Sequence, residues 1–183
     1  MAQHIIEPAS LLARYWPLFQ KAAGLGQVID LACGRGRNGL FLASKGIPVV
    51  LIDRSEMRLI QARRLARQAG VGADIRRLDL EQAGRNPLEG FAAGGMLVFR
   101  YLYRPLIPAM RKCIRSGGIL MYETFTHDQQ RFGKPRNPDH LLRPEELKSW
   151  FRDWRILHYF EGLKADPPRF VAQIVCRKTD LPA

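Results

Sequence analysis

The stretch Val28-Ile29-Asp30-Leu31-Ala32-Cys33-Gly34-Arg35-Gly36-Arg37-Asn38-Gly39 decides the fold of this 183-residue chain. It begins as a short apolar run, which predicts a buried parallel strand. Gly34 and Gly36 then predict a sharp turn into a helix over residues 39–45. Because the first amides of a helix favour negative charge, and glycines let a ligand approach the backbone, this turn predicts a binding site.

The spacing Gly34-x-Gly36-x-x-Gly39 also matches the dinucleotide fingerprint, with Asp53 near the expected distance for a ribose-binding acid. Asp30 argues against a dinucleotide, because its carboxylate would repel a pyrophosphate and would suit a ligand that carries a positive amino group. The stretch therefore favours a nucleoside bearing an amino acid over NAD. A turn without any ligand is the alternative.

Composition predicts one domain, because 183 residues are enough for a full core. No apolar run is long enough for a membrane span, and the N-terminus lacks the pattern of a secretory signal, so we expect neither. Three isolated cysteines predict neither a disulfide framework nor a zinc site and suggest a reducing cytoplasm; they are Cys33, Cys113 and Cys176. His4, His140 and His158 have no metal-ligand spacing.

The formal net charge of +12 comes mostly from arginines, several of which fall on one predicted helix. They are Arg54, Arg58, Arg63, Arg64 and Arg67, followed by Arg76 and Arg77. Such an excess of positive charge can attract nucleic acid or an anionic substrate. Since no aromatic residues interleave these arginines as stacking platforms, a solvated face is favoured over a nucleic-acid site.

Strands and helices alternate along the predicted chain. A helix over 8–23, broken at Pro17, precedes the glycine turn. Predicted strands cover 47–52, 73–78, 96–99 and 119–122. Predicted helices cover 56–68, with Ser55 and Gly70 as its caps, and 106–115. Residues 81–95 are predicted to be irregular and residues 116–118 to form a turn. Two last strands, 154–160 and 170–177, are joined by a loop over 162–169 and so must pair antiparallel.

The glycine turn, the Ser116-Gly117-Gly118 turn and this element order resemble the class I S-adenosylmethionine methyltransferases. The resemblance implies an α/β, Rossmann-like fold with a mostly parallel seven-stranded sheet and a C-terminal antiparallel strand pair. It implies a single domain, 1–183, with an N-terminal helical cap (1–24), a cofactor-binding half (25–125) and a substrate-side part (126–183). Arg37-Asn38, Glu123-Thr-Phe and the 131–138 loop resemble small bacterial proteins grouped with the tellurite-resistance methyltransferases.

The resemblance implies S-adenosylmethionine as the cofactor. Asp30 would hold the methionine amino group, Asp53 the ribose hydroxyls and Asp79 the adenine amine. The other implied cofactor-binding residues are Ala32, Gly34, Gly36, Asn38, Arg54, Leu80 and Arg100.

The loop after the fourth strand faces the crevice where acceptor substrates belong in such a sheet. It carries neither Asp/Asn-Pro-Pro-aromatic nor Pro-Cys, which counts against methylation of nucleobase amines or cytosine carbon. Tyr101 is a candidate for substrate contact and catalysis, and Glu123 and His127 are candidate bases. Arg131 and Arg136 are candidates for recruiting an anionic acceptor, and Arg100 or Arg104 for pairing with an anion.

The favoured function is methyl transfer to a small molecule, such as a thiol, a metalloid oxyanion or another anionic metabolite. A methyltransferase acting on RNA or another polyanion is the first alternative. An NAD(P) oxidoreductase and a non-catalytic relative that keeps the cofactor pocket are further alternatives. The sequence leaves the oligomeric state open.

Overall fold

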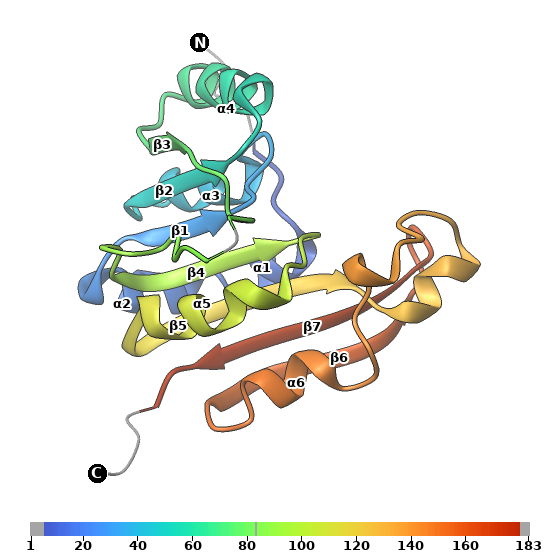
Figure 1. Cartoon of the computed structure of the whole chain (residues 1–183). Helices are drawn as coiled ribbons and strands as arrows, with labels where there is room; N and C mark the ends of the chain where they lie inside the picture. The colour runs from blue at the N-terminus through green and yellow to red at the C-terminus, as the bar shows by residue number, and fades with distance from the viewer. Residues whose placement is uncertain (1–5, 83, 180–183) are drawn as a thin grey trace.

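A seven-stranded sheet organises the chain in the computed structural model, which describes residues 6–82 and 84–179. The strands are β1 (Val28–Leu31), β2 (Val49–Asp53), β3 (Asp74–Arg77), β4 (Ala93–Phe99), β5 (Ile114–Phe125), β6 (Arg155–Lys164) and β7 (Arg169–Arg177). Their order is β3-β2-β1-β4-β5-β7-β6 (Figure 1). The first five are parallel and β7 is antiparallel to both β5 and β6, which confirms the predicted fold class.

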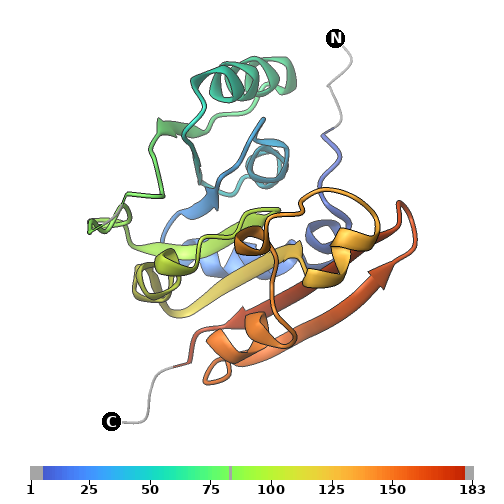
Figure 2. The ribbon, with the colours of Figure 1, turned by 45° about the vertical axis from the view of Figure 1, so that its right-hand side comes forward.

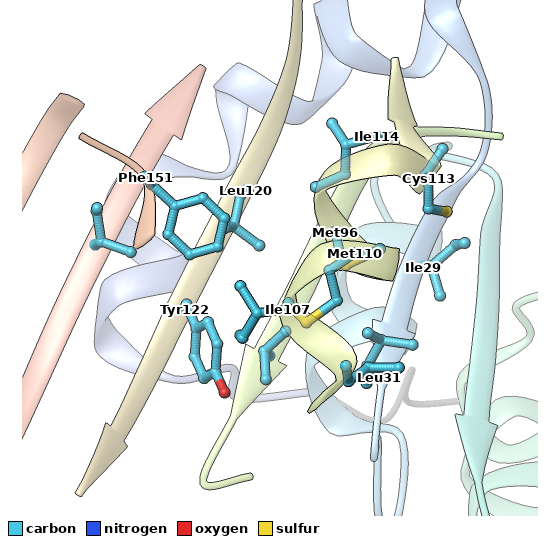
Figure 3. Packing of buried hydrophobic residues seen from close by; sticks show 14 of the residues in the cluster. Ile29, Leu31, Met96, Ile107, Met110, Cys113, Ile114, Leu120, Tyr122 and Phe151 are labelled. Atoms are coloured by element: carbon cyan, nitrogen blue, oxygen red, sulfur yellow. The ribbon is translucent and has the colours of Figure 1, made fainter. Parts of the chain in front are cut away.

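Helices cover both faces of this sheet (Figure 1). One face carries α1 (Ser10–Tyr15), α2 (Pro17–Ala22), α3 (Arg37–Ala43) and α4 (Glu56–Ala69), and the other carries α5 (Ile107–Cys113) and α6 (Glu146–Trp150). Alternate strand residues supply the two cores, because successive side chains point to opposite faces. Figure 3 shows Ile107 and Met110 of α5 packed near Met96, Leu31 and Tyr122.

Local signals set the helix boundaries much as predicted. The first helix is split at Pro17, where α2 begins and a missing amide costs nothing. The Ser55 side chain accepts a hydrogen bond from the amide of Arg58 at 3.4 Å and starts α4. Gly70 ends that helix in the left-handed region, with φ of 67°.

The start of β4 corrects one prediction. Residues 81–95 are predicted to be irregular, yet Ala93, Gly94 and Gly95 already belong to the strand. A Cβ at Gly95 would lie 2.7 Å from Cδ1 of Phe19, and one at Gly94 would lie 2.0 Å from the carbonyl oxygen of Ala22. These glycines let α2 pack directly on the sheet, so a composition typical of a loop is here a packing requirement.

The ends of β5 and of the last two strands correct further predictions. The predicted helix 106–115 stops at Cys113, and the predicted turn 116–118 lies inside β5, because Gly117 and Gly118 exchange backbone hydrogen bonds of 2.9 Å with Lys178. Half of the predicted loop 162–169 is strand, since pairing between β6 and β7 continues to Lys164 and Arg169 and leaves only residues 165–168 as the turn. Pairing partners distant in sequence override the local glycine signal.

The segment 126–145 stands at the carboxyl end of β5, beside the β6–β7 hairpin (Figures 1 and 2). It holds two short 3₁₀ helices, His127–Arg131 and Pro138–His140. A bridge between Thr126 and Leu142 closes its base, and the amide of Phe170 donates to Oε1 of Gln129 at 2.9 Å. In the part of the chain that the structure describes, no helix has the length and apolarity that a membrane crossing needs.

Candidate cofactor and acceptor site

The turn after β1 is braced by the carboxylate at the end of β2. Oδ2 of Asp53 accepts a hydrogen bond from the Gly34 amide at 2.8 Å, and Oδ1 accepts one from the Ser55 amide, also at 2.8 Å. The Asp53 side chain is only 4% exposed, with the Arg58 guanidinium 4.0 Å away. Each carboxylate oxygen has two acceptor sites, so both can also accept hydroxyls of a ligand.

Asp30 lies buried beneath the same turn. Its Oδ2 accepts a hydrogen bond from the Gly39 amide at 2.9 Å. A Cβ at Gly39 would lie 2.2 Å from Cδ2 of Leu51, so glycine is needed where α3 approaches the sheet. Burial raises the pKa of Asp30 to about 7, and the Asp53 charge adds to this, against the lowering effect of the Gly39 hydrogen bond. A ligand cation close to this carboxyl would favour its charged form.

A cavity of about 110 Å³ opens above the ends of β1 and β2. It brings together five of the residues predicted to bind the cofactor: Ala32, Asp53, Arg54, Asp79 and Leu80, with Arg58, Glu81 and Tyr101 completing the lining. No heavy atom lies within 4 Å of the place where a Gly34 Cβ would be, so the backbone of the turn is open to a ligand. The chemistry of these residues therefore suits a nucleoside, of which the cavity of about 110 Å³ takes one part.

A larger cavity of about 600 Å³ adjoins the small one above the ends of β4 and β5. The two cavities share Arg54, Glu81 and Tyr101. The larger one is also lined by Arg100 and Leu102 after β4, by Thr124 and Phe125 of β5, and by Lys134, Pro135, Arg136, Asn137 and His140 of the segment 126–145. A second ligand bound here would lie next to one in the small cavity.

Tyr101 stands at the junction of the two cavities. Its hydroxyl is buried and has no hydrogen-bond partner within the described residues, an arrangement that calls for an explanation in a folded protein. Burial raises the pKa of Tyr101, and the nearby carboxylate of Glu81 adds to this. The phenol therefore stays protonated at neutral pH and can donate a hydrogen bond to a ligand.

Glu123 and His127, the candidate bases, line neither of these cavities. The Glu123 carboxylate is buried, accepts a hydrogen bond from Gln173 and lies 3.6 Å from Nζ of Lys164. His127 is exposed, with Nε2 3.4 Å from Nε2 of Gln130. Because a base must reach the proton that it removes, neither position supports the predicted role.

The predicted anion-binding arginines fall into two groups. Arg100 and Arg136 line the larger cavity. Arg131 does not, and its guanidinium pairs with Asp128 at 3.3 Å. Arg104 also lies outside the cavity lining: it makes a bidentate pair with Glu146 and donates to the carbonyl oxygens of Asp139 and Leu141, so its donors are used inside the protein.

Two further residues predicted to bind the cofactor have structural partners. Oδ1 of Asn38 is buried and accepts a hydrogen bond from the Ala9 amide at 2.9 Å, which ties the N-terminal segment to α3. Gly36 precedes α3 with φ of 76°, and a Cβ there would lie 2.8 Å from Cδ1 of Leu51. Both shape the turn, and neither lines the two cavities.

Sequence reasoning missed most of the acceptor-side lining. Thr124 and Phe125 follow Glu123 directly, but their outward direction depends on the register of β5. Lys134, Pro135 and Asn137 belong to the 131–138 loop, whose position after a strand end was the available signal. His140 also lines the cavity, although its spacing in the sequence indicates no role. No cluster of three or more metal-ligating side chains occurs within residues 6–82 and 84–179; His4 lies outside them.

The fold and these cavities together define the class. A glycine turn after β1, an acid at the end of β2, a cavity above β4 and β5 and an antiparallel β7 are the features of the class I methyltransferase fold. The family described as "Tellurite resistance protein TehB" matches residues 20–165. The chain belongs to this family, which confirms the resemblance noted in the sequence.

Individual relatives are more distant. A probable S-adenosyl-L-methionine-dependent methyltransferase TehB of Haemophilus influenzae is 25% identical over 142 residues, covering 75% of this chain and 49% of the relative. A ubiquinone biosynthesis O-methyltransferase of Hahella chejuensis is 26% identical over 144 residues, covering 69% of this chain and 60% of the relative. The chain thus spans about half to three fifths of the length of these relatives.

Among solved structures, the crystal structure of TehB from Haemophilus influenzae superposes with a TM-score of 0.69 at 20% identity, covering 90% of this chain and 62% of the other. A protein from Pyrococcus horikoshii superposes with a TM-score of 0.67 at 14% identity, covering 97% of this chain and 95% of the other. At these identities the superpositions establish the fold.

Proposed function

We propose that this chain is an S-adenosylmethionine-dependent methyltransferase that acts on a small-molecule acceptor. The observation that carries the proposal is the pair of adjoining cavities that meet at Tyr101, one against a buried carboxylate and a glycine turn, the other lined by cations. Membership of the TehB family supports the reaction, since its relative from Haemophilus influenzae is described as a probable methyltransferase that uses this cofactor.

On the cofactor side, the chain offers groups that match each part of S-adenosylmethionine. The Asp53 carboxylate is placed to accept ribose hydroxyls, and Asp79 and Leu80 border the same cavity for the adenine. The Asp30 carboxyl provides negative charge beneath the turn for the ammonium and sulfonium end. The bound cofactor supplies a methyl group on sulfur, which a nucleophile displaces in line.

On the acceptor side, the chain offers a cavity in which a nucleophile can be positioned. Leu102 is buried and Phe125 half-buried in the wall of the larger cavity, and the unpartnered Tyr101 hydroxyl can donate a hydrogen bond to a ligand at the junction. Holding two reactants in line can supply about 7 kcal/mol or more of the barrier reduction. A soft nucleophile such as a thiolate or a metalloid oxyanion then needs no base. The bases predicted from the sequence, Glu123 and His127, lie outside the lining, whereas Glu81 and His140 are part of it.

A small acceptor is favoured over a polyanion because several arginines near α4 are already paired with acids. Arg63 pairs with Glu56 at 2.7 Å, and Arg76 with Asp74 at 2.6 Å. Cys33, Cys113 and Cys176 are free thiols, which supports a reducing cytoplasm as the place of the reaction.

Calorimetry with S-adenosylhomocysteine tests the proposal. We expect binding of this product and no binding of NADH. Asp53→Asn removes the charge against the ribose hydroxyls and is expected to weaken binding by about 100-fold, since hydrogen bonds to a charged group contribute about 1.5–3 kcal/mol each.

Asp74→Asn is the matched control. Asp74 begins β3 and pairs with Arg76 at the opposite end of the sheet, so its loss is expected to leave affinity within about twofold. Tighter binding of NADH than of S-adenosylhomocysteine, or equal losses in the two variants, would remove the basis for the proposed cofactor site.

A further inference from the structure

The larger cavity combines a cationic mouth with apolar walls. Arg100, Lys134 and Arg136 are exposed at the surface of the cavity. Tyr101, Leu102 and Phe125, in contrast, are buried or half-buried. A ligand that matches both parts has an apolar body inside and a negative charge toward solvent.

The cations at the mouth are available to a ligand. Within the described residues, the side chains of Arg100, Lys134 and Arg136 take part in no ion pair or hydrogen bond, whereas Arg54 in the same lining pairs with Glu81 at 3.2 Å. Arg100 comes from the end of β4 and the other two from the segment 126–145, so the fold gathers three separate positive charges around one opening.

The extent of the lining favours a ligand longer than a compact inorganic ion. The larger cavity, of about 600 Å³, is shared between the acceptor and the part of the cofactor that extends beyond the small cavity of about 110 Å³. Its lining runs from the end of β4 across β5 to the segment 126–145. The cofactor site lies against β1 and β2, whereas Thr124 and Phe125 are on β5, two strands away from β1. With strands about 4.8 Å apart, roughly 10 Å separates the cofactor end from this far wall.

We propose that the acceptor is an organic anion with an apolar, ring-sized body, whose charged group lies at Arg100, Lys134 and Arg136 and whose nucleophilic atom points toward Tyr101. This inference rests on the proposed methyltransferase function and narrows it. It departs from a metalloid oxyanion as the substrate, because such an ion would leave the apolar walls in contact with water.

The orientation follows from the two ends of the cavity. The charged group pairs with the exposed cations, and the body contacts Leu102 and Phe125. The nucleophilic atom then reaches the junction with the small cavity, where the buried Tyr101 hydroxyl lacks a partner. In the methyl transfer, a bond forms from the acceptor atom to the methyl carbon as the carbon–sulfur bond breaks and its electron pair stays on sulfur. The sulfur of a thiolate acceptor thus becomes a neutral thioether sulfur, and the separate charged group of the acceptor keeps its charge.

The test is binding to the protein saturated with S-adenosylhomocysteine, whose neutral sulfur removes any attraction to a sulfonium. The probes are 4-mercaptobenzoate, its counterpart without the carboxylate (4-methylbenzenethiol), selenite and tellurite. We expect 4-mercaptobenzoate to bind at least 10-fold more tightly than each of the other three. Release of S-adenosylhomocysteine from S-adenosylmethionine should follow the same order of probes.

The variant Lys134→Gln/Arg136→Gln should reduce the preference for 4-mercaptobenzoate over 4-methylbenzenethiol to within about twofold, with binding of S-adenosylhomocysteine unchanged. Arg115→Gln is the control, because Arg115 is exposed at the opposite end of β5 and should leave the preference intact. Tighter binding of selenite or tellurite, or no preference between the two thiols, would overturn the inference. Absence of S-adenosylhomocysteine binding would instead overturn the proposed function.

Discussion

The two sides of the site differ in how their polar groups are held. On the cofactor side, the carboxylates of Asp30 and Asp53 are buried, and three of their four oxygens accept hydrogen bonds from backbone amides. On the acceptor side, the cations of Arg100, Lys134 and Arg136 are exposed and have no partner within the described residues. The cofactor side is thus fixed by short-range bonds before any ligand binds, and the acceptor side keeps its charges for the ligand.

The difference extends to the chain that builds each side. The glycine turn and its carboxylates come from residues 28–55, a short contiguous stretch. The acceptor side joins the ends of β4 and β5 to the segment 126–145, which is held in place by Arg104 and by contacts with the β6–β7 hairpin. Changes on the cofactor side should therefore affect cofactor binding alone, and changes in the supports of the segment should affect the acceptor alone.

After Asp53→Asn, the largest effect on the cofactor side is expected for Asp30→Asn. The folded pKa of Asp30 is about 7, and a bound ammonium or sulfonium favours the carboxylate, so cofactor binding should release a proton near pH 7. Affinity of the wild type for S-adenosylmethionine should rise as pH increases through 7. At pH 8 the variant should bind about 30-fold more weakly and release no proton, as measured by calorimetry in buffers of different ionisation enthalpy.

The stability of the unliganded protein should change in the opposite direction. The ordinary pKa of Asp30, 3.8, applies to the unfolded chain, so between about pH 4 and pH 7 the folded state holds the extra proton and stability falls as pH rises. The amide of Asp30→Asn cannot ionise. Thermal unfolding should then show the unliganded variant more stable than wild type at pH 8 and similar near pH 4. If Asp30→Asn bound S-adenosylmethionine as tightly as the wild type, and the wild type released no proton on binding, Asp30 would only support the turn.

The same contrast explains what the sequence predicts well. The alternation of apolar strands with capped helices predicts the parallel part of the sheet, because each signal lies within a few residues of its effect. The five predicted cofactor residues that line the small cavity all lie at the carboxyl ends of β1, β2 or β3 or in the chain just after them. Parallel strands bring such positions to one edge, so their meeting follows from the strand order alone.

What the sequence predicts less well depends on distant partners. Glycines 94 and 95 indicate a loop until α2 is known to pack on them, and glycines 117 and 118 indicate a turn until their pairing with Lys178 is known. Likewise Arg104, an arginine in the loop after β4, is predicted to pair with an anion. Only its 2.8 Å contact with Glu146, 42 residues away, shows that its charge is used within the protein.

The next effect in size concerns Arg104. Hydrogen bonds to Glu146 raise the pKa of Arg104. Burial alone would raise the pKa of Glu146, but its contacts with Arg104 outweigh burial and lower that pKa. The same guanidinium donates to the carbonyl oxygens of Asp139 and Leu141 and so holds the wall of the larger cavity. Arg104→Met should raise KM for the acceptor about 10-fold, with less than twofold change in affinity for S-adenosylhomocysteine.

Arg111→Met is the matched control for that experiment. Arg111 also makes a bidentate contact, with Asp153 at 3.0 and 2.6 Å, and it is exposed to the same degree as Arg104, but it joins α5 to the chain after α6 away from both cavities. It should lower thermal stability without raising KM. If both variants raise KM alike, the effect is one of general stability, and the supposed independence of the two sides fails.

The smallest effect is expected for Glu123→Gln, which tests whether Glu123 acts as a base. Glu123 shares β5 with Thr124 and Phe125 of the cavity wall, but its carboxylate is bonded to Gln173 and lies near Lys164. An amide of the same shape can still bond Gln173, so kcat should fall less than threefold and the pH profile should keep its shape. Tyr101→Phe, which removes the unpartnered hydroxyl at the junction, should reduce kcat more than Glu123→Gln. If Glu123→Gln instead lost more than 100-fold in kcat, and the acidic limb of the pH profile disappeared, Glu123 would be established as a base. Proton transfer would then take place on the face of the sheet that packs against α1.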